Sequence, residues 1–395
     1  MGRQPTHMGR QPTHMGRQPA HPRHAAHPCH AAHASHASRP CRRPTAHPSG
    51  GFQMEFEFAQ YESGTASRPA LPAFGGPAEP PATVTTTVPR EYVHKAALAE
   101  VLLTGWHRTD DDAFTVTAQW PRSHSFYRSR HGVHDPMLFA ETVRQIFPLL
   151  SHAAYTVPFG HHLIWEHFSY RTDPGTEGMR AGLLPAEVTL YVDCHDVVQR
   201  RGVLSALSLH VEARRDGVRL GSAETRFTSH APAIYRRLRG AYADKEAALA
   251  AAVPVPLPIP AHRVGHKLRE NVVLAATRSA RRWQLRVDPY HPVLFDHPVD
   301  HVPGALLLEA ARQAAHVVSG PLPTVATSMD TRFTRFAELD APCWIDAEPE
   351  PGGTGRVHVV IHQNGQELFT ATVGTSRLTT DEPAVAAARP VYAHS

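Results

Sequence analysis

The chain has 395 residues, of which 42% are hydrophobic and 19% charged, which is typical of a globular protein of about two domains. Lys and Arg number 40 against 36 Asp and Glu, a formal charge of +4. Seven Arg and no acidic residue fall in residues 1–50, so the rest carries +4 less seven, or −3. A net acidic globular part gives no support for nucleic-acid binding.

The cysteines and the hydropathy of the chain exclude further classes of protein. The four cysteines form no C-x-x-C pair, so neither a zinc site nor a disulfide framework is indicated. The longest apolar run, residues 247–261, is interrupted by four prolines and cannot form a membrane span. We therefore expect a soluble cytoplasmic protein without a metal, a cofactor or a membrane partner. The cysteines are Cys29, Cys41, Cys194 and Cys343.

The first part of the chain is of low complexity. A seven-residue unit occurs three times, and a histidine then stands at every third position from His21 to His36. Such sequence has little to bury, so we expect a disordered extension over residues 1–87, with Met54 as an alternative start. Metal capture by the closely spaced imidazoles is the alternative interpretation.

From Arg90 onward the chain repeats itself. Leu138–Gln145 matches Leu306–Gln313 at an offset of 168 residues. His94-Lys95 and His266-Lys267 occur near the start of each copy and suggest a role shared by the repeat. Asp-Gly and Asn-Gly pairs between alternating segments predict one β-hairpin in each copy, at residues 216–217 and 364–365.

Each copy contains one helix that is apolar on nearly every face and is therefore expected to be buried. The first begins at Asp135-Pro136 and the second at Pro303-Gly304. We expect an α+β fold in which each half wraps an antiparallel sheet around its helix. The predicted boundaries are 88–250 for the first domain, 251–262 for a Pro-rich linker, 263–380 for the second domain and 381–395 for a flexible tail.

Both helices carry the pattern Glu-x-x-Arg-Gln, which places a carboxylate and a guanidinium on one helix face. Burying them is costly unless they are paired or used. One interpretation is a structural ion pair that fixes helix packing. The other is a catalytic carboxylate whose pKa is raised by desolvation, beside a cation. The residues are Glu141, Arg144, Gln145, Glu309, Arg312 and Gln313.

The second helix, Pro303–Gln313, resembles that of hot-dog-fold 3-hydroxyacyl-carrier-protein dehydratases. Those enzymes carry a catalytic His eight residues before the Pro of their Pro-Gly pair, where this chain has Phe295. The departure removes one member of the acid–base pair that dehydration needs. His297 and His301 lie nearby, out of register.

Residues 90–380 as a whole are more similar to the A-factor biosynthesis (AfsA-like) γ-butyrolactone autoregulator synthases of actinomycetes. The resemblance implies a tandem double hot-dog enzyme that joins a 3-oxoacyl group, delivered as an acyl-carrier-protein thioester, to dihydroxyacetone phosphate. It also implies that Glu141, Glu309 and Arg312 are active-site groups. The motifs that carry it are the Val-His-Lys-type openings of both halves, Gln119–Arg122, His134–Pro136 and Glu141–Gln145.

The residue types suit that reaction. A carboxylate can take the hydroxyl proton of the triose, a guanidinium such as Arg312 matches phosphate, and free N–H groups at the Gly304 helix start can bind the thioester oxygen. Pro136, at the position of Gly304 in the first half, has no N–H to offer. The predicted substrate-binding residues are Arg144, Gln145, Gly304, Gln313, Phe295 and His297.

Other candidates are weaker. Asp296-His297 is a candidate pair, and His134-Asp135 is better explained as helix capping. Basic residues at 236–239, 278 and 281–282 could dock an acidic carrier protein. The remaining histidines before the helices are His124, His131, His134, His291 and His301, for each of which an ordinary structural role is favoured.

Two alternatives to the acyltransferase stay open. One is a hot-dog thioesterase or dehydratase that acts on acyl thioesters. The other is a non-catalytic acyl-binding or butyrolactone-binding regulator, which is disfavoured because both halves keep Glu, Arg and Gln and because no DNA-binding helix pair is recognisable.

Overall fold

The computed structural model describes residues 86–320 and 324–377. The predicted flexible tail and all but the last two residues of the predicted extension lie outside these residues. In the described part, no helix is both long and apolar enough to cross a membrane. The cytoplasmic location stays a prediction.

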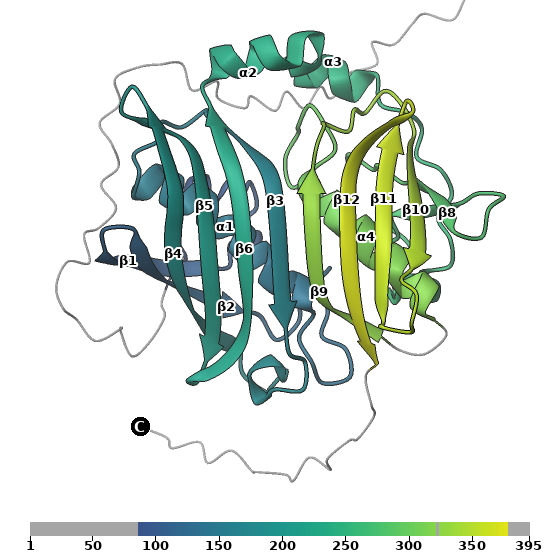
Figure 1. The fold of residues 1–395 in the computed structure, drawn as a ribbon, viewed down its shortest axis with the longest axis horizontal. Helices are drawn as coiled ribbons and strands as arrows, with labels where there is room; N and C mark the ends of the chain where they lie inside the picture. Colours follow the sequence, from purple (N-terminus) through teal and green to yellow (C-terminus); the bar gives the residue numbers. More distant parts are fainter. Residues whose placement is uncertain (1–85, 321–323, 378–395) are drawn as a thin grey trace, which may run out of the picture. The chain divides into compact units, whose positions relative to one another are not determined.

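The two halves contain corresponding elements in the same chain order (Figure 1). The first half consists of η1 (Arg90–Val93), η2 (Leu98–Glu100), β1 (Leu103–Asp110), β2 (Ala113–Trp120), α1 (Pro136–Ala153), β3 (His162–Thr172), η3 (Glu177–Met179), β4 (Ala186–Arg200), β5 (Val203–Arg215) and β6 (Val218–His230). The segment that joins the halves contains α2 (Pro232–Arg239), η4 (Gly240–Ala243) and α3 (Lys245–Ala250). The second half consists of η5 (Ala261–Val264), β7 (Leu274–Ala276), β8 (Arg282–Leu285), α4 (Gly304–Ser319), β9 (Thr324–Phe333), β10 (Cys343–Pro349), β11 (Arg356–Gln363) and β12 (Gln366–Arg377).

The twelve strands of the described residues belong to one sheet, in the order β1-β2-β4-β5-β6-β3-β9-β12-β11-β10-β8-β7. Read from either end, this order visits equivalent strands, which confirms the duplication. The halves join where β3 pairs antiparallel with β9, for example Tyr170 opposite Met329. With α1 and α4 lying along one face of the sheet (Figure 1), this is a tandem double hot-dog, as predicted.

Local sequence explains the elements that position the helices. In β2 buried and half-buried residues alternate, with Phe114 and Trp120 fully buried, because successive side chains point to opposite faces. Both hairpin turns are confirmed. Asp216 and Asn364 have φ of 50° and 52°, and the glycine after each is also left-handed.

The helix starts are confirmed as well. Asp135 caps α1 by accepting a hydrogen bond from the Met137 N–H at 3.0 Å, and Pro136 is the first helical residue. Pro303 precedes α4 and provides no side-chain cap. Most side chains of both helices are buried, because each helix fills the interior of its own half.

The segment predicted as a linker packs on the second half. The Val253 N–H donates to the Leu339 carbonyl, and the Ile259 N–H donates to the Leu274 carbonyl. The exact domain limits stay predictions.

Candidate active site

Two short turns, η1 and η5, lead into equivalent positions of the two halves. Each turn is followed by a left-handed residue, His94 (φ 52°) after η1 and Gly265 (φ 71°) after η5. The next residues, Lys95 and His266, therefore correspond. The sequence-based match of His94-Lys95 to His266-Lys267 was wrong by one position. His94 is the left-handed residue of its half, whereas His266 follows the left-handed residue of the other half.

We define the first-half cluster as Lys95, Glu141, Arg144 and Gln145. Lys95 Nζ lies 3.0 Å from Glu141 Oε1, and Arg144 Nε lies 2.9 Å from Oε2. Gln145 donates to Oε1 at 2.9 Å. Glu141 is 5% exposed and is therefore held in the interior by two cations and an amide.

We define the second-half cluster as His266, Glu309, Arg312 and Gln313. Arg312 donates to both carboxylate oxygens of Glu309, from Nε to Oε2 at 2.8 Å and from Nη2 to Oε1 at 2.6 Å. His266 Nε2 lies 2.8 Å from Oε1, and Gln313 donates to the same oxygen at 2.6 Å. The two clusters therefore differ chiefly in having Lys95 or His266 beside the carboxylate.

The two glutamines hold the segment that precedes the first strand of each half. Gln145 accepts from the Leu102 N–H at 2.9 Å and donates to the Glu100 carbonyl at 2.8 Å. Gln313 makes the same pair of bonds, at the same distances, to Val273 and Asn271. Glu100 and Asn271 are therefore equivalent. Both amide protons of each glutamine are already used, which favours a positioning role, and substrate binding by them stays a prediction.

The charge state of the glutamates differs from the expectation. Burial alone raises the pKa of Glu141, but Arg144 and Lys95 outweigh it and lower the pKa to about 2. Arg312 and His266 likewise hold the pKa of Glu309 well below its usual range. Both carboxylates are ionised at neutral pH, so the prediction that desolvation makes them bases near neutrality was wrong.

His266 is the titratable group of the second-half cluster that can accept a proton. Burial lowers its pKa below the ordinary value, although Glu309 opposes the shift, so the imidazole is neutral at pH 7. His266 Nε2 lies 2.8 Å from Glu309 Oε1 and 2.9 Å from Arg312 Nη2. In the tautomer with the proton on Nε2, the ring donates to Glu309 and keeps a lone pair on Nδ1. The sequence showed His266 only as part of a repeated pair, and its contact with Glu309 depends on the tertiary fold.

The loop before each helix reaches the other half. Asp296, in the loop before α4, accepts hydrogen bonds from the Ala96 and Ala97 N–H groups at 2.5 and 3.1 Å, next to Lys95. Phe126, before α1, packs on the rings of His266 and His291, each at 5.2 Å. Each cluster is therefore completed by a loop from the opposite half.

The predicted residues Phe295 and His297 flank Asp296, which places their loop against the segment of Ala96 and Ala97 beside the first-half cluster. Phe295 is buried, and its N–H donates to the His291 carbonyl. His297 is half-exposed, with Nδ1 3.3 Å from Asp296. Their substrate-binding role stays a prediction.

His124 and His291 occupy equivalent positions in the two halves but differ in what their Nε2 atoms contact. Nδ1 of each accepts N–H groups from the residues two and three further along the chain, which places the proton on Nε2. His124 Nε2 lies 3.3 Å from a Glu100 carboxylate oxygen. His291 Nε2 is buried without a hydrogen-bond partner among the described residues, where the equivalent of Glu100 is Asn271.

The packing around position 304 explains why the residue there is glycine. A Cβ there would come within 2.9 Å of the Trp165 ring and 3.4 Å of the Phe333 ring. A glycine is therefore required by the aromatic rings that cover the start of α4. Packing alone explains the glycine, and binding of the thioester by its N–H stays a prediction.

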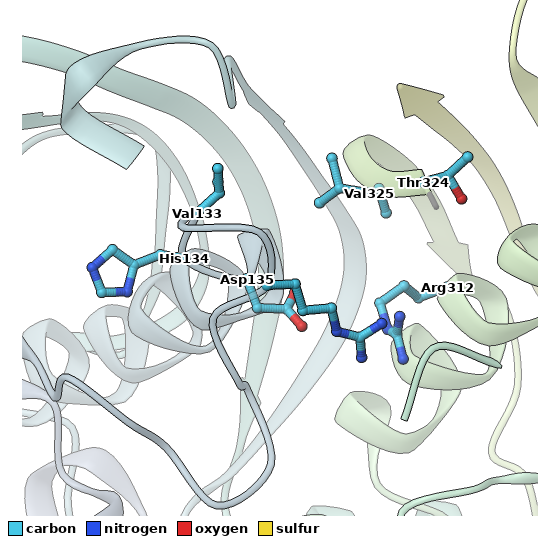
Figure 2. Close-up of a pocket in the computed structure, with 8 residues that line it drawn as sticks. Val133, His134, Asp135, Arg312, Thr324 and Val325 are labelled. Carbon is cyan, nitrogen blue, oxygen red and sulfur yellow. The ribbon is translucent and has the colours of Figure 1, made fainter. Parts of the chain in front are cut away.

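A pocket opens between the start of α1 and the middle of α4 (Figure 2). Asp135 and Arg312 come from opposite halves and point toward the same space, whereas the His134 ring points away. The lining residues are Arg130, Val133, His134, Asp135, Arg312, Thr324, Val325 and Ala326.

Comparison with known proteins assigns the family. The A-factor biosynthesis (AfsA) hotdog domain matches residues 77–230 and 247–379. This chain belongs to the AfsA family. It is 46% identical over 297 residues to a Streptomyces virginiae protein named 2-oxo-3-(phosphooxy)propyl 3-oxoalkanoate synthase, covering 74% of this chain and 98% of that one. Proteins of the same name from Streptomyces coelicolor and Streptomyces griseus are 42% and 39% identical, covering 72% and 73% of this chain and 90% and 95% of theirs.

The basic residues predicted to dock a carrier protein are only partly available in this AfsA-family chain. Arg239 is buried and pairs with Asp300 and Glu338, so its place in the docking patch was wrong. Arg236 and Arg237, on α2, are exposed. Arg281 and Arg282 pair with acidic residues of β10.

Buried histidines predict how the stability of this AfsA-family protein depends on pH. Burial lowers the pKa of each of four histidines, to about 3 for one and about 4 for three, whereas the unfolded chain titrates near 6.5. As pH falls below 6.5, the unfolded state takes up protons that the folded state refuses, so stability is lost. We expect the urea midpoint to fall steadily from pH 7 to pH 4, and a constant midpoint would contradict this. The histidines are His94, His134, His162 and His316.

Proposed function

We propose that this chain transfers a 3-oxoacyl group from a carrier-protein thioester to the hydroxyl of dihydroxyacetone phosphate. The product is a 2-oxo-3-(phosphooxy)propyl 3-oxoalkanoate, the compound after which the relatives are named. The observation that carries the proposal is the second-half cluster, in which a neutral imidazole, an ionised carboxylate and a guanidinium lie together and the guanidinium, that of Arg312, also lines a pocket. The exposed Arg236 and Arg237 support an acidic carrier protein as the donor's partner.

The reaction is assigned to the second-half cluster. In the first-half cluster the residue beside the carboxylate is Lys95, which pairs with Glu141 at 3.0 Å. His266 occupies that position in the second half and can accept a proton on Nδ1. Arg312 also lines the pocket, and it was the guanidinium expected to meet the phosphate.

The acyl transfer then uses the residues as follows. His266 accepts the hydroxyl proton of the triose, and Glu309 stabilises the imidazolium that forms. The hydroxyl oxygen bonds to the thioester carbon, the C–S bond breaks, and the carrier thiol leaves with the proton. The unpaired Nε2–H of His291 is the hydrogen-bond donor for the oxyanion that develops on the thioester oxygen.

The proposal is tested by incubating the full chain with a 3-oxoacyl thioester and dihydroxyacetone phosphate, and identifying products by mass spectrometry. An ester of the triose phosphate, or the butenolide phosphate formed from it, is the expected product. Free 3-oxo acid formed equally with and without the triose phosphate would make the protein a thioesterase. An unchanged thioester would leave the binding or regulatory alternative.

The role of His291 predicts a difference between two equivalent residues. In His291→Asn, the side-chain oxygen can replace Nδ1 as acceptor of the loop N–H groups, but the Nε2–H is lost. We expect kcat to fall about 100-fold, as for loss of an oxyanion donor. His124→Asn removes the matched group of the first half and should leave kcat within about 3-fold of wild type. Equal losses in the two variants would contradict the role given to His291.

A further inference from the structure

One cation of the pocket makes no ion pair with any described residue. Arg130, from the loop before α1, is half-buried, and its guanidinium makes no hydrogen bond or ion pair within residues 86–320 and 324–377. Burial and the nearby Arg312 lower the pKa of Arg130, and the more weakly acting Asp135 and Glu309 do not cancel that shift. A partly buried cation of this kind is costly unless an anion binds beside it.

Arg130 and Arg312 approach the same piece of backbone from opposite halves. Arg312 Nη2 lies 3.5 Å from the Val264 carbonyl oxygen. Arg130 Nη1 lies so close to the next residue, Gly265, that a Cβ there would collide with it. In the first half the equivalent of Gly265 is His94, whose side chain would occupy this space. The lack of a side chain at position 265 thus leaves room for a second guanidinium at the second-half cluster alone.

The hydrogen-bonding groups of Arg312 are divided between the cluster and the pocket. Nε and Nη2 are used by Glu309, whereas Nη1 makes no hydrogen bond in the part of the chain that the structure describes. Asp135, the remaining charged residue of the pocket lining, uses Oδ1 to cap α1. Its Oδ2 accepts no hydrogen bond from the described residues. The pocket therefore offers donors for an anion and one acceptor for a hydroxyl.

We propose that Arg130 and Arg312 form a phosphate site at the junction of the two halves, with Asp135 as acceptor for a hydroxyl of the same small molecule. The chemistry of these three groups suits a phosphorylated hydroxy compound. This inference rests on the proposed function, because it assigns the phosphate of the acyl acceptor to residues of both halves. It also explains why a single half would not suffice, since each half supplies one guanidinium.

The test compares Arg130→Gln with Arg122→Gln, which removes an exposed arginine from the same loop. Binding of inorganic phosphate and of dihydroxyacetone phosphate to the full chain is measured by calorimetry, and the KM of each substrate is measured separately. In Arg130→Gln we expect the Kd and KM for dihydroxyacetone phosphate to rise about 10- to 100-fold, with the KM for the thioester unchanged. Arg122→Gln should match wild type in each measurement.

Two further readouts separate ligand binding from a structural role. The Tm of Arg130→Gln should equal or exceed that of wild type, because the substitution removes repulsion from Arg312, whereas a structural arginine would lower it. Asp135→Asn keeps a good helix cap but removes a negative charge, so inorganic phosphate should bind more tightly. Weaker or unchanged phosphate binding in Asp135→Asn would contradict the proposed arrangement.

The outcomes also distinguish this site from the proposed function. Phosphate binding that depends on Arg130, in a protein that makes no ester, would support the site and overturn the acyltransferase. Ester formation with a KM for dihydroxyacetone phosphate that is indifferent to Arg130 would support the acyltransferase and overturn the site. Equal weakening in Arg130→Gln and Arg122→Gln would reduce the effect to general surface charge and would also overturn the site.

Discussion

Replacing His266 by Gln is expected to lower kcat for acyl transfer by about 10²- to 10⁴-fold, the usual contribution of a general base. Gln can still donate a hydrogen bond to Glu309, so the carboxylate keeps its partner, but no group remains to take the hydroxyl proton. The matched control is Lys95→Gln at the equivalent position of the first half. It should keep kcat within about 3-fold of wild type, because the first-half cluster is not assigned the chemistry.

The pH profile adds a second readout for His266. A base must be unprotonated to act, and burial lowers the pKa of His266. The rate should therefore hold at neutral pH and fall only as the pH drops below the ordinary histidine value of about 6.5. That acid limb should vanish from the residual activity of His266→Gln. An unaltered acid limb in the variant would assign the base to another residue.

Glu141→Gln is expected to cost about 3–5 kcal/mol of unfolding free energy, because it leaves Lys95 and Arg144 buried without their counter-ion. For a chain of this size the loss corresponds to a fall in Tm of about 10 °C. Urea or thermal unfolding of the full chain measures it. The second substitution Lys95→Met should recover part of the loss by removing one of the stranded cations. A fully stable Glu141→Gln without activity would instead support the catalytic role that the family resemblance implies.

The repeat, the helix starts and the hairpin turns were predictable because their signals are local. Asp135 caps its own helix, and Asn364-Gly365 adopts positive φ whatever packs around it. The burial of Glu141 and Glu309 was also predictable, since apolar residues surround each of them on the helix.

The partners from outside the helices, Lys95 and His266, were not predictable, because they come from distant segments. His266 lies 43 residues before Glu309. Aligning the repeats by residue identity matched it to His94 instead of Lys95. The direction of the pKa shift was also missed, because it depends on geometry: burial alone would have raised the pKa of Glu309, and the contacts from Arg312 and His266 reverse the sign. Arg130 reaches the second-half cluster only because β3 and β9 join the halves into one sheet.

The central claim is that one of two equivalent clusters carries out acyl transfer to a phosphorylated triose. The most direct measurement is the rate of ester formation by wild type, Arg312→Gln and Arg144→Gln, with 3-oxoacyl thioester and dihydroxyacetone phosphate, followed by mass spectrometry. We expect ester in wild type, a loss of at least about 100-fold in Arg312→Gln, and ester formation by the folded fraction of Arg144→Gln at near the wild-type rate. Ester formation that survives Arg312→Gln and is lost in folded Arg144→Gln would contradict it.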